Sequence, residues 1–363
     1  MKRLLYALTS VVMLACLAGC EKDEGKKWAS IKGQVIDVEK GQGFSGLMVW
    51  IVEMEQDTTI TAITAKNGTF EFNRLHEGRY TIKIQKEGYI DYGKNDIELI
   101  AGQSMWIDIE MVRGYMETEF DLGMVYVEGG TFEMGATAEQ GNVADNNEYP
   151  VRTIKVDSYY IGKYEVTQAQ WEAVMGTSLE EQRALSTYDY GIVGEGTDYP
   201  MYYVNWYEAQ EFCDRLSEAT GKRYVLPTEA QWEYAARGGN KSKGYKYSGS
   251  NDVEEVAWYE GNSYSLGESH PDYGAHRVGT KKANELGLYD MSGNLWEWCS
   301  DWYASRYDEK DTDNPQGPVS GSDRVERGGS WTYYDRGCRV SVRGHAKSSY
   351  RGYRVGFRVA CLL

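Results

Sequence analysis

This 363-residue chain has few histidines, and fewer positively than negatively charged residues. Only four histidines occur, at His76, His270, His276 and His345, and none has the HExxH spacing of zinc proteases, so a catalytic zinc site is not expected. Lys and Arg number 39 against 55 Asp and Glu, a net charge of −16. Nucleic acids and anionic lipid surfaces attract clustered cations, so this balance argues against both as general partners.

Phenylalanine is also scarce, with seven residues, whereas Tyr (30) and Trp (11) are abundant. Tyr and Trp join an apolar body to a polar tip and suit half-wet surfaces and ligand sites. The alternative is that large aromatics fill an irregular, loop-rich core. At 41% hydrophobic and 26% charged residues the composition is that of a globular protein, long enough for two domains or three small ones.

The N-terminus has the pattern of an export signal. A basic start is followed by an apolar run, 4–17, that is too short to span a bilayer comfortably. The ending Leu17-Ala18-Gly19-Cys20 resembles a bacterial lipobox, which implies cleavage before Cys20 and lipidation of its thiol; an ordinary signal peptide is the alternative. The acidic tract 21–24 resembles the surface-export signal of Bacteroidetes lipoproteins, although residues 21–28 could equally be a simple tether. We therefore expect an exported protein, lipid-anchored in the outer membrane and exposed at the cell surface, with no further membrane span.

Residues 29–113 alternate apolar and polar side chains, the period-2 pattern of strands. Asn67-Gly68 lies between two such runs and predicts a type I′ hairpin joining 63–66 to 69–72. Short strands and Gly-rich turns indicate a small β-sandwich. The spacing of Gly33, Gly78-Arg79-Tyr80 and Gly88-Tyr89 resembles the carboxypeptidase regulatory-like domain, a transthyretin- or immunoglobulin-like sandwich. That resemblance implies a spacer or binding module without a catalytic role.

Residues 114–120 are expected to be a linker to a second domain, 121–363. There, residues 124–135 alternate as a predicted hairpin. Three helix starts are predicted at Thr167, Asn205 and Thr228, and at the last two a Glu or Gln three residues on completes a capping box. Apolar residues recur at helical spacing after Asn205, so that helix face is expected to be core, and Gly221 should end it. Residues 242–282 show little periodicity and are expected to form a long ordered loop.

Four blocks give the second domain its strongest signal: 226–239, 287–298, 327–331 and 356–358. They resemble the formylglycine-generating enzyme family, also called sulfatase-modifying factors, whose fold is related to C-type lectins. The resemblance implies an α+β protein in which the N-terminal β-sandwich precedes a loop-rich, C-type-lectin-like domain.

The block 287–298 suggests a cation site. Asp290 and Glu297 bracket backbone carbonyls in a Gly-containing turn, and calcium prefers carboxylate and carbonyl oxygens. The resemblance implies a structural calcium bound by Asp290, Glu297 and the backbone oxygens of Gly293 and Leu295. The alternative is that Glu297 caps a helix or pairs with an arginine.

The redox site of the family is incomplete here. Its catalysts bind copper(I) through two cysteines, and the resemblance places Cys338 at the second position but Tyr333 at the first. A phenol is a poor ligand for copper(I), whereas thiolates suit it. Copper is therefore not expected, and oxidase activity is predicted to be lost unless Cys299 substitutes. If the site were active, Cys338 and Ser330 would be its catalytic residues.

Four cysteines remain after the predicted lipidation site, and in an oxidising compartment they allow three pairings. Resemblance to bacterial relatives implies a Cys299–Cys338 disulfide, which leaves Cys213 to approach Cys361.

The C-terminal stretch is rich in residues that anchor partners. In the family it lines an open cleft, and in C-type-lectin-like proteins diversified by retroelements it is the variable binding site. The predicted cleft residues are Trp331, Tyr333, Tyr334, Arg336, Arg339, Arg343, His345, Tyr350 and Tyr353. The alternative for each arginine is an internal ion pair with the excess acid.

These observations together predict an exported binding or scaffold protein whose ligand is a surface protein or a glycan. A formylglycine-generating-type oxidase acting on a sulfatase cysteine and a carbohydrate-binding lectin-like protein are the alternatives.

Overall fold

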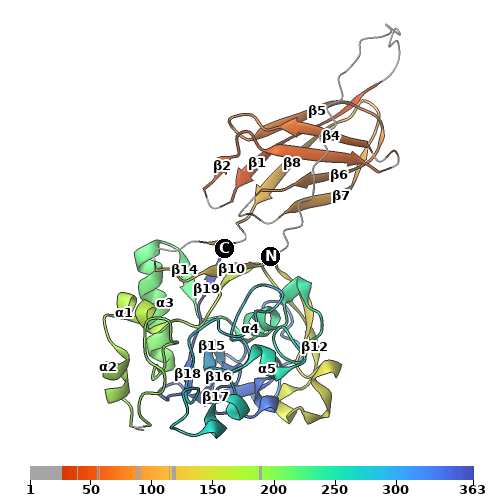
Figure 1. Ribbon diagram of the computed structural model, residues 1–363. Coiled ribbons are helices and arrows are strands. Elements are labelled where there is room, and N and C mark those ends of the chain that lie inside the picture. Colours follow the sequence, from red (N-terminus) through yellow and green to blue (C-terminus); the bar gives the residue numbers. More distant parts are fainter. Residues whose placement is uncertain are drawn as a thin grey trace, which may run out of the picture. The chain divides into compact units, whose positions relative to one another are not determined.

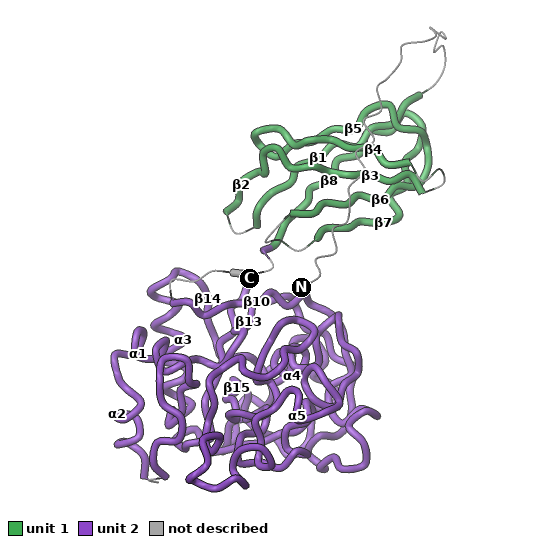
Figure 2. The backbone as a smooth tube through the Cα atoms, in the orientation of Figure 1, with its two compact units in different colours: residues 1–112 green, residues 113–363 purple. Residues whose placement is uncertain are grey.

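The computed structural model describes residues 27–363 except 39, 55, 57, 87, 88, 90, 114, 117–119, 188 and 189. The predicted signal peptide with Cys20, and residues 21–26 of the predicted tether, lie outside the described residues. The chain forms two compact units, 1–112 and 113–363 (Figure 2). Each unit is described by itself.

The described residues of unit 1 form a sandwich of two four-stranded sheets. Its strands are β1 (Ala29–Asp37), β2 (Gln42–Gly43), β3 (Met48–Glu53), β4 (Thr58–Ile63), β5 (Thr69–Leu75), β6 (Gly78–Ile84), β7 (Tyr92–Leu99) and β8 (Ser104–Met111). One sheet has the order β2-β1-β5 with β8 parallel to β1, and the other has the order β4-β3-β6-β7 (Figure 1). Every second side chain of β1 is buried, as the period-2 pattern predicted, because one face of the strand packs on the core.

The predicted hairpin at Asn67-Gly68 is wrong in its pairing. The chain does turn there, since Gly68 has a φ of +86° and its N–H donates to the carbonyl of Ala65. However, β4 pairs with β3 while β5 pairs with β1, so the turn joins two different sheets. Turn chemistry fixes a local reversal, whereas the buried faces of the strands select their partners.

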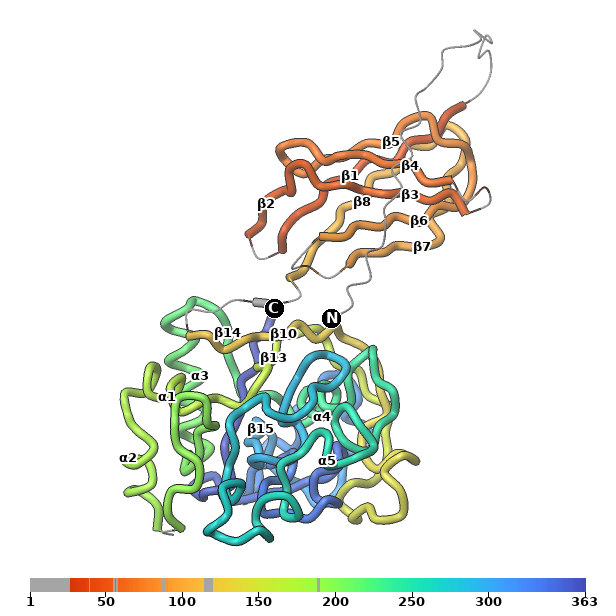
Figure 3. Tube along the Cα trace, viewed as in Figure 1, coloured from red at the N-terminus to blue at the C-terminus, as the bar shows by residue number. Residues whose placement is uncertain are grey.

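Unit 2, as far as its residues are described, contains three sheets. They have the orders β14-β19-β13-β10-β9, β11-β12 and β17-β16-β15-β18. Their strands are β9 (Tyr115–Met116), β10 (Met124–Val127), β11 (Gly130–Met134), β12 (Arg152–Val156), β13 (Tyr159–Gly162), β14 (Arg223–Val225), β15 (Trp296–Trp302), β16 (Asp323–Arg327), β17 (Arg343–Lys347), β18 (Val355–Gly356) and β19 (Ala360–Leu362). Strands β13 and β19 come from opposite ends of the unit and lie side by side (Figure 3).

Short α-helices and 3-10 turns surround these sheets. The helices are α1 (Gln168–Met175), α2 (Leu179–Ala184), α3 (Trp206–Thr220), α4 (Glu229–Ala236) and α5 (Val253–Val256), and the 3-10 turns are Ala138–Val143, Asn146–Glu148, Gly239–Lys241, Glu260–Asn262, Tyr264–Leu266 and Asp335–Cys338. The long stretch 242–282, all of it described, contains only α5 and two 3-10 turns, in line with the predicted loop.

The predicted helix starts are confirmed. Thr167, Asn205 and Thr228 each accept a hydrogen bond from the third residue of their helix and complete a capping box. Gly221 ends α3 with a left-handed φ of 69°, a conformation that glycine adopts without strain. The apolar face of α3 is buried as expected.

The predicted hairpin over 124–135 is wrong, for the same reason as the first. Its two strands form, but β10 pairs with β13 and β9, while β11 pairs with β12. The predicted linker 114–120 also contains strand β9.

Trp171, Trp232, Trp298 and Trp331 are fully buried, so many aromatics of unit 2 fill its core. The fold is α+β, a β-rich unit followed by a mixed, loop-rich one. Within the described part of the chain, no helix has the length and apolarity needed to cross a membrane.

Candidate functional site

Three of the four sequence blocks of unit 2 meet at one buried carboxylate, Glu297. Its two oxygens face the guanidinium of Arg358, with Nε–Oε2 at 2.6 Å and Nη2–Oε1 at 2.7 Å, and Oε2 also accepts a hydrogen bond from Trp232 Nε1 at 2.7 Å. The three side chains come from β15, from the chain after β18 and from α4. Such a charge-assisted fork is strong and directional, so it locks the three blocks in one arrangement.

Two further carboxylates lie near this pair. Glu165 accepts hydrogen bonds from Asn294 Nδ2 at 2.7 Å and from the Leu295 N–H at 3.0 Å, and thereby holds the turn that precedes β15. Burial, together with Asp290 and Glu297, raises the pKa of Glu165 well above its usual range. Burial likewise raises the pKa of Asp290 to about 6, against the lowering effect of the Gly279 N–H and Arg358. The guanidinium of Arg358 thus pairs with Glu297, and its charge also opposes the rise in the pKa of Glu165 and of Asp290.

The predicted calcium set does not fit as the residues stand. Glu297 has the alternative arrangement that the sequence left open, an ion pair with an arginine. Asp290 Oδ2 accepts from the Gly279 N–H, and the described residues hold no cluster of three or more Asp, Glu, His or Cys side chains disposed around a metal. Calcium binding at these residues therefore stays a prediction.

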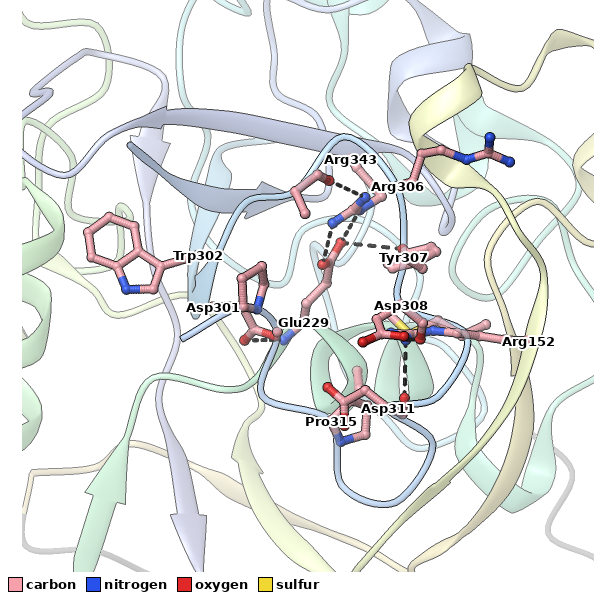
Figure 4. Close-up of a pocket in the computed structure, with 15 residues that line it drawn as sticks. Arg152, Glu229, Asp301, Trp302, Arg306, Tyr307, Asp308, Asp311, Pro315 and Arg343 are labelled. Atoms are coloured by element: carbon pink, nitrogen blue, oxygen red, sulfur yellow. Dashed lines mark hydrogen bonds and ion pairs between the residues drawn. The ribbon is translucent and has the colours of Figure 1, made fainter. Parts of the chain in front are cut away.

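A second ionic network in unit 2 is centred on the buried carboxylate of Glu229. Glu229 accepts from Arg327 Nη1 at 2.9 Å. It also accepts from Arg343 Nε at 2.6 Å and from the hydroxyl of Tyr307 (Figure 4). Figure 4 also shows Asp301 accepting from the Glu229 N–H at the start of α4, beside a cavity of about 150 Å³. Arg152 also lines this cavity and donates hydrogen bonds to the backbone carbonyls of Asp308 and Asp311.

A groove of about 540 Å³ lies at the predicted cleft. We call it the C-terminal groove; it is lined by Val143, Asp145, Asn147, Trp296, Thr332, Tyr333, Tyr334, Arg336, Gly337, Arg339, Val342, Arg343, Gly344 and His345. Tyr333 packs edge-on against Trp296, with ring centroids 5.1 Å apart, and Tyr334 is 62% exposed. The aromatic wall is thus formed by a strand and a loop that lie far apart in sequence.

Six of the nine predicted cleft residues line this groove, but only four offer their side chains. Tyr333, Tyr334, Arg336 and His345 are at least partly exposed. Arg339 is buried and ion-paired with Glu148 at 2.6 Å. Arg343 is likewise buried and paired with Glu229. For these two arginines the alternative of an internal ion pair is the correct one.

The other three predicted residues lie outside the groove. Trp331 is fully buried and packs against Tyr353, with ring centroids 5.6 Å apart. Tyr353 also contacts Tyr190 at 4.5 Å, and Tyr350 lines a separate shallow pocket beside Arg351. No sequence pattern indicated this division, because it depends on which way each loop residue turns.

The structure contains neither of the predicted disulfides. Cys213, Cys299, Cys338 and Cys361 are all buried thiols. Cys299 lies in the main hydrophobic core and Cys338 in a separate small cluster with Val256 and Ala257, so their thiols point into different parts of the interior. Burial raises the pKa of the Cys338 thiol well above its usual range, and its side chain points toward the carbonyl of Tyr334. Ser330, the other residue predicted for an active site, is also fully buried.

Sequence reasoning missed the groove residues that come from elsewhere in the chain. Asn147 donates to the carbonyl of Arg343 and to the hydroxyl of Tyr303, and so fixes one edge. Tyr303 in turn positions the predicted residue His345, since the two rings stack with centroids 4.0 Å apart. His345 Nδ1 also lies 2.8 Å from Asp323 Oδ2. Of the missed residues, Trp296 alone had a signal, since it belongs to the block 287–298.

Residues 116–362 match the family model described as the sulfatase-modifying factor enzyme 1-like domain. The chain belongs to this family. Residues 30–112 match the carboxypeptidase regulatory-like domain. The family resemblance of both parts, inferred from the sequence blocks, is therefore confirmed.

Several relatives are similar to this member of the family. The chaperone protein LppX of Paenibacillus barcinonensis is 33% identical over 278 residues, covering 65% of this chain and 88% of the relative. The formylglycine-generating enzyme of Streptomyces coelicolor is 29% identical over 286 residues, covering 66% and 88%.

Among solved structures, Treponema denticola variable protein 1 is 31% identical with a TM-score of 0.53, covering 66% of this chain and 95% of that one. PvdO from Pseudomonas aeruginosa is 25% identical with a TM-score of 0.57, covering 69% and 98%.

Buried acids give unit 2 a predictable pH dependence. Burial raises the pKa of Asp290 to about 6, of Asp301 to about 7 and of Glu326 to about 8. A folded-state pKa above the unfolded value means that the stabilisation is complete at low pH and is lost as pH rises through the folded pKa. We therefore expect the free energy of unfolding of unit 2, measured by urea titration, to fall between about pH 5 and about pH 8.5.

Glu326→Gln tests this expectation, because Glu326 Oε1 is buried without a hydrogen bond. The variant should be more stable than the wild type at about pH 8.5 by about 2 kcal/mol and nearly unchanged at about pH 5. Glu218→Gln, on the exposed face of α3, is the control and should change neither value. An equal effect of Glu326→Gln at both pH values would contradict the assignment.

Proposed function

We propose that this protein is an exported, lipid-anchored binding or scaffold protein that holds a partner in the C-terminal groove, without copper oxidase activity. The observation that carries the proposal is the groove wall itself. Tyr333 and Tyr334 present aromatic surface, and the buried ring of Trp296 supports Tyr333 from behind. Arg336 adds an exposed guanidinium, and no thiol is among the described residues that line the groove. Aromatic and arginine side chains are those that most often dominate binding energy.

The thiol arrangement supports the absence of copper chemistry. Copper(I) sites in this family need two cysteines, and the resemblance places Tyr333 at the first position. Cys338 is fully buried, and burial raises the pKa of its thiol, which disfavours the thiolate that binds metal. Cys299 lies in the main core and does not line the groove, so it offers no substitute ligand there.

Two similar proteins support a binding role. LppX is named a chaperone, and the Treponema denticola protein is named a variable protein. Both names fit a protein that presents a binding surface better than they fit an oxidase. The proposed partner is accordingly another exported protein bound through the groove.

Copper titration tests the missing oxidase. We expect the full-length wild type to bind no stoichiometric copper(I) and to leave a cysteine peptide unoxidised in air. Tyr333→Cys adds a thiol at the position where the family's copper catalysts have their first cysteine, and should gain up to about one copper(I) per chain. Tyr334→Cys is the matched control, since it adds a thiol at the neighbouring, exposed position and should gain little. Stoichiometric copper in the wild type with aldehyde formation would overturn the proposal.

Partner binding is tested by photo-crosslinking from position 334 in cells that produce the protein. We expect crosslinks to a small set of exported proteins, reduced by Arg336→Ala and unaffected by Arg277→Ala, an exposed arginine outside the groove. Crosslinks that are unchanged by Arg336→Ala would contradict binding in the groove.

A further inference from the structure

Unit 1 carries a hollow that a role as a spacer does not explain. It lies on the outer face of the β4-β3-β6-β7 sheet and has a volume of about 540 Å³. It is lined by Trp50, Val52, Thr59, Lys83, Gln85, Asp91, Tyr92 and Gly93. The inner face of the same sheet is core: Val49 and Ile51 of β3 are fully buried. A spacer needs only that inner face.

An apolar strip runs along β3 on the outer face. Met48, Trp50 and Val52 point outward at every second residue, which spaces them about 7 Å apart. Ile63 lies directly opposite Met48 on β4, and these two are 66% and 42% exposed. The strip follows one strand and is only a few side chains wide, so it suits an extended chain better than a globular partner.

Polar groups border the strip at Trp50. Thr61 of β4 and Lys83 of β6 are its direct cross-strand neighbours. At one end of the hollow Gln85 Nε2 donates to Asp91 Oδ2 at 2.8 Å, and both residues are exposed. The pair still offers one amide proton, the amide oxygen and a carboxylate oxygen to a ligand.

The opposite sheet provides an internal comparison. Trp106 of β8 is 56% exposed, but its indole N–H is committed to Asp108 at 2.7 Å. Beside it, Lys32 is paired with Glu71 at 2.6 Å. Trp50 and Trp106 thus lie on the outer faces of the two sheets of one sandwich. Of these two, only Trp50 lines the hollow, together with the polar side chains of Lys83, Gln85 and Asp91.

We propose that this hollow binds a neutral polysaccharide, with a pyranose ring stacked on Trp50 and its hydroxyls hydrogen-bonded by Gln85, Asp91 and Lys83. A pyranose ring has an apolar face of C–H groups and an edge of hydroxyls, which matches an indole bordered by amide, carboxylate and ammonium groups. The charged residues that line the hollow are one cation, Lys83, and one anion, Asp91, so the lining has no excess charge to attract a charged chain, and uncharged glycans are the expected class. This binding is independent of the C-terminal groove.

Affinity electrophoresis of the full-length protein through gels containing a neutral glucan, xylan or mannan tests the proposal. We expect at least one of the three to retard the wild type, and Trp50→Ala to weaken that retardation at least about tenfold. Trp50→Phe should retain part of it, Gln85→Ala should weaken it less than Trp50→Ala, and Trp106→Ala should leave it unchanged.

Thermal unfolding of each variant checks that unit 1 stays folded, which the outward position of both tryptophans favours. The proposal is overturned if none of the three polysaccharides retards the wild type, if Trp50→Ala binds as tightly as the wild type, or if Trp106→Ala loses as much. Because Tyr334 and Arg336 are untouched in these variants, a failure here leaves the groove proposal standing, and the reverse also holds.

Discussion

Replacing Arg358 by alanine is expected to destabilise unit 2 by about 3 to 5 kcal/mol, because it breaks a buried ion pair by removing one partner. Arg358 is fully buried and forks with Glu297, and its remaining N–H groups donate to the carbonyls of Gly162 and Tyr289 at 2.9 Å. Its loss leaves the Glu297 carboxylate buried without its partner and removes a nearby positive charge from Glu165 and Asp290. Urea unfolding followed by tryptophan fluorescence measures the change.

Arg215→Ala is the matched control. Arg215 also pairs with a glutamate, Glu211, at 2.6 Å, but both side chains are about half exposed, so its loss should cost less than about 1 kcal/mol. Arg358→Lys keeps the charge but not the fork and should fall between the two. A cost for Arg358→Ala no greater than for Arg215→Ala would show that the buried centre does not stabilise the fold.

The same titration tests the predicted calcium. A calcium ion at Asp290 would raise the unfolding midpoint of the wild type in calcium relative to chelator, and Asp290→Asn would remove that rise. Equal unfolding midpoints in calcium and in chelator would show that calcium does not bind there. The negative charge of the buried carboxyl groups would then be offset by protonation and by Arg358 alone.

Gly293→Ala is expected to cost about 3 to 5 kcal/mol, the second large effect. Gly293 has a φ of 80°, and an added Cβ would lie 2.2 Å from the carbonyl oxygen of Trp258. That oxygen accepts the Asn294 N–H at 2.8 Å, so the methyl group would push apart the hydrogen bond that closes the turn. The turn also carries Asp290 and leads into β15.

Gly287→Ala separates backbone strain from collision. Gly287 has nearly the same φ, 83°, but an added Cβ there meets no atom within 4 Å. It should therefore cost only the left-handed strain of about 1 to 2 kcal/mol. Equal losses for the two variants, measured by urea unfolding, would mean that close packing against Trp258 is unimportant.

Three of the five α-helix starts among the described residues, and the family membership, could be read from the sequence, whereas α2, α5 and the strand partners could not. Thr167, Asn205 and Thr228 were correct as helix starts because a capping box involves residues three apart. The Asn67-Gly68 turn also formed, but its strands joined different sheets, since pairing depends on which faces are buried. A local signal therefore fixed the turn but not the hairpin.

The candidate site divides in the same way. From the sequence alone came the two domains, their family, the excess of acid and the expectation, implied by the family resemblance, that Tyr333 stands where copper catalysts have a cysteine. Only the tertiary structure decided that Arg339 and Arg343 are committed to internal carboxylates while Arg336 stays exposed, and that Cys299 and Cys338 lie in separate clusters. The physical reason is distance along the chain: caps and turns are settled within a few residues, whereas Arg339 meets Glu148 across 191 positions, and no local pattern encodes such a contact.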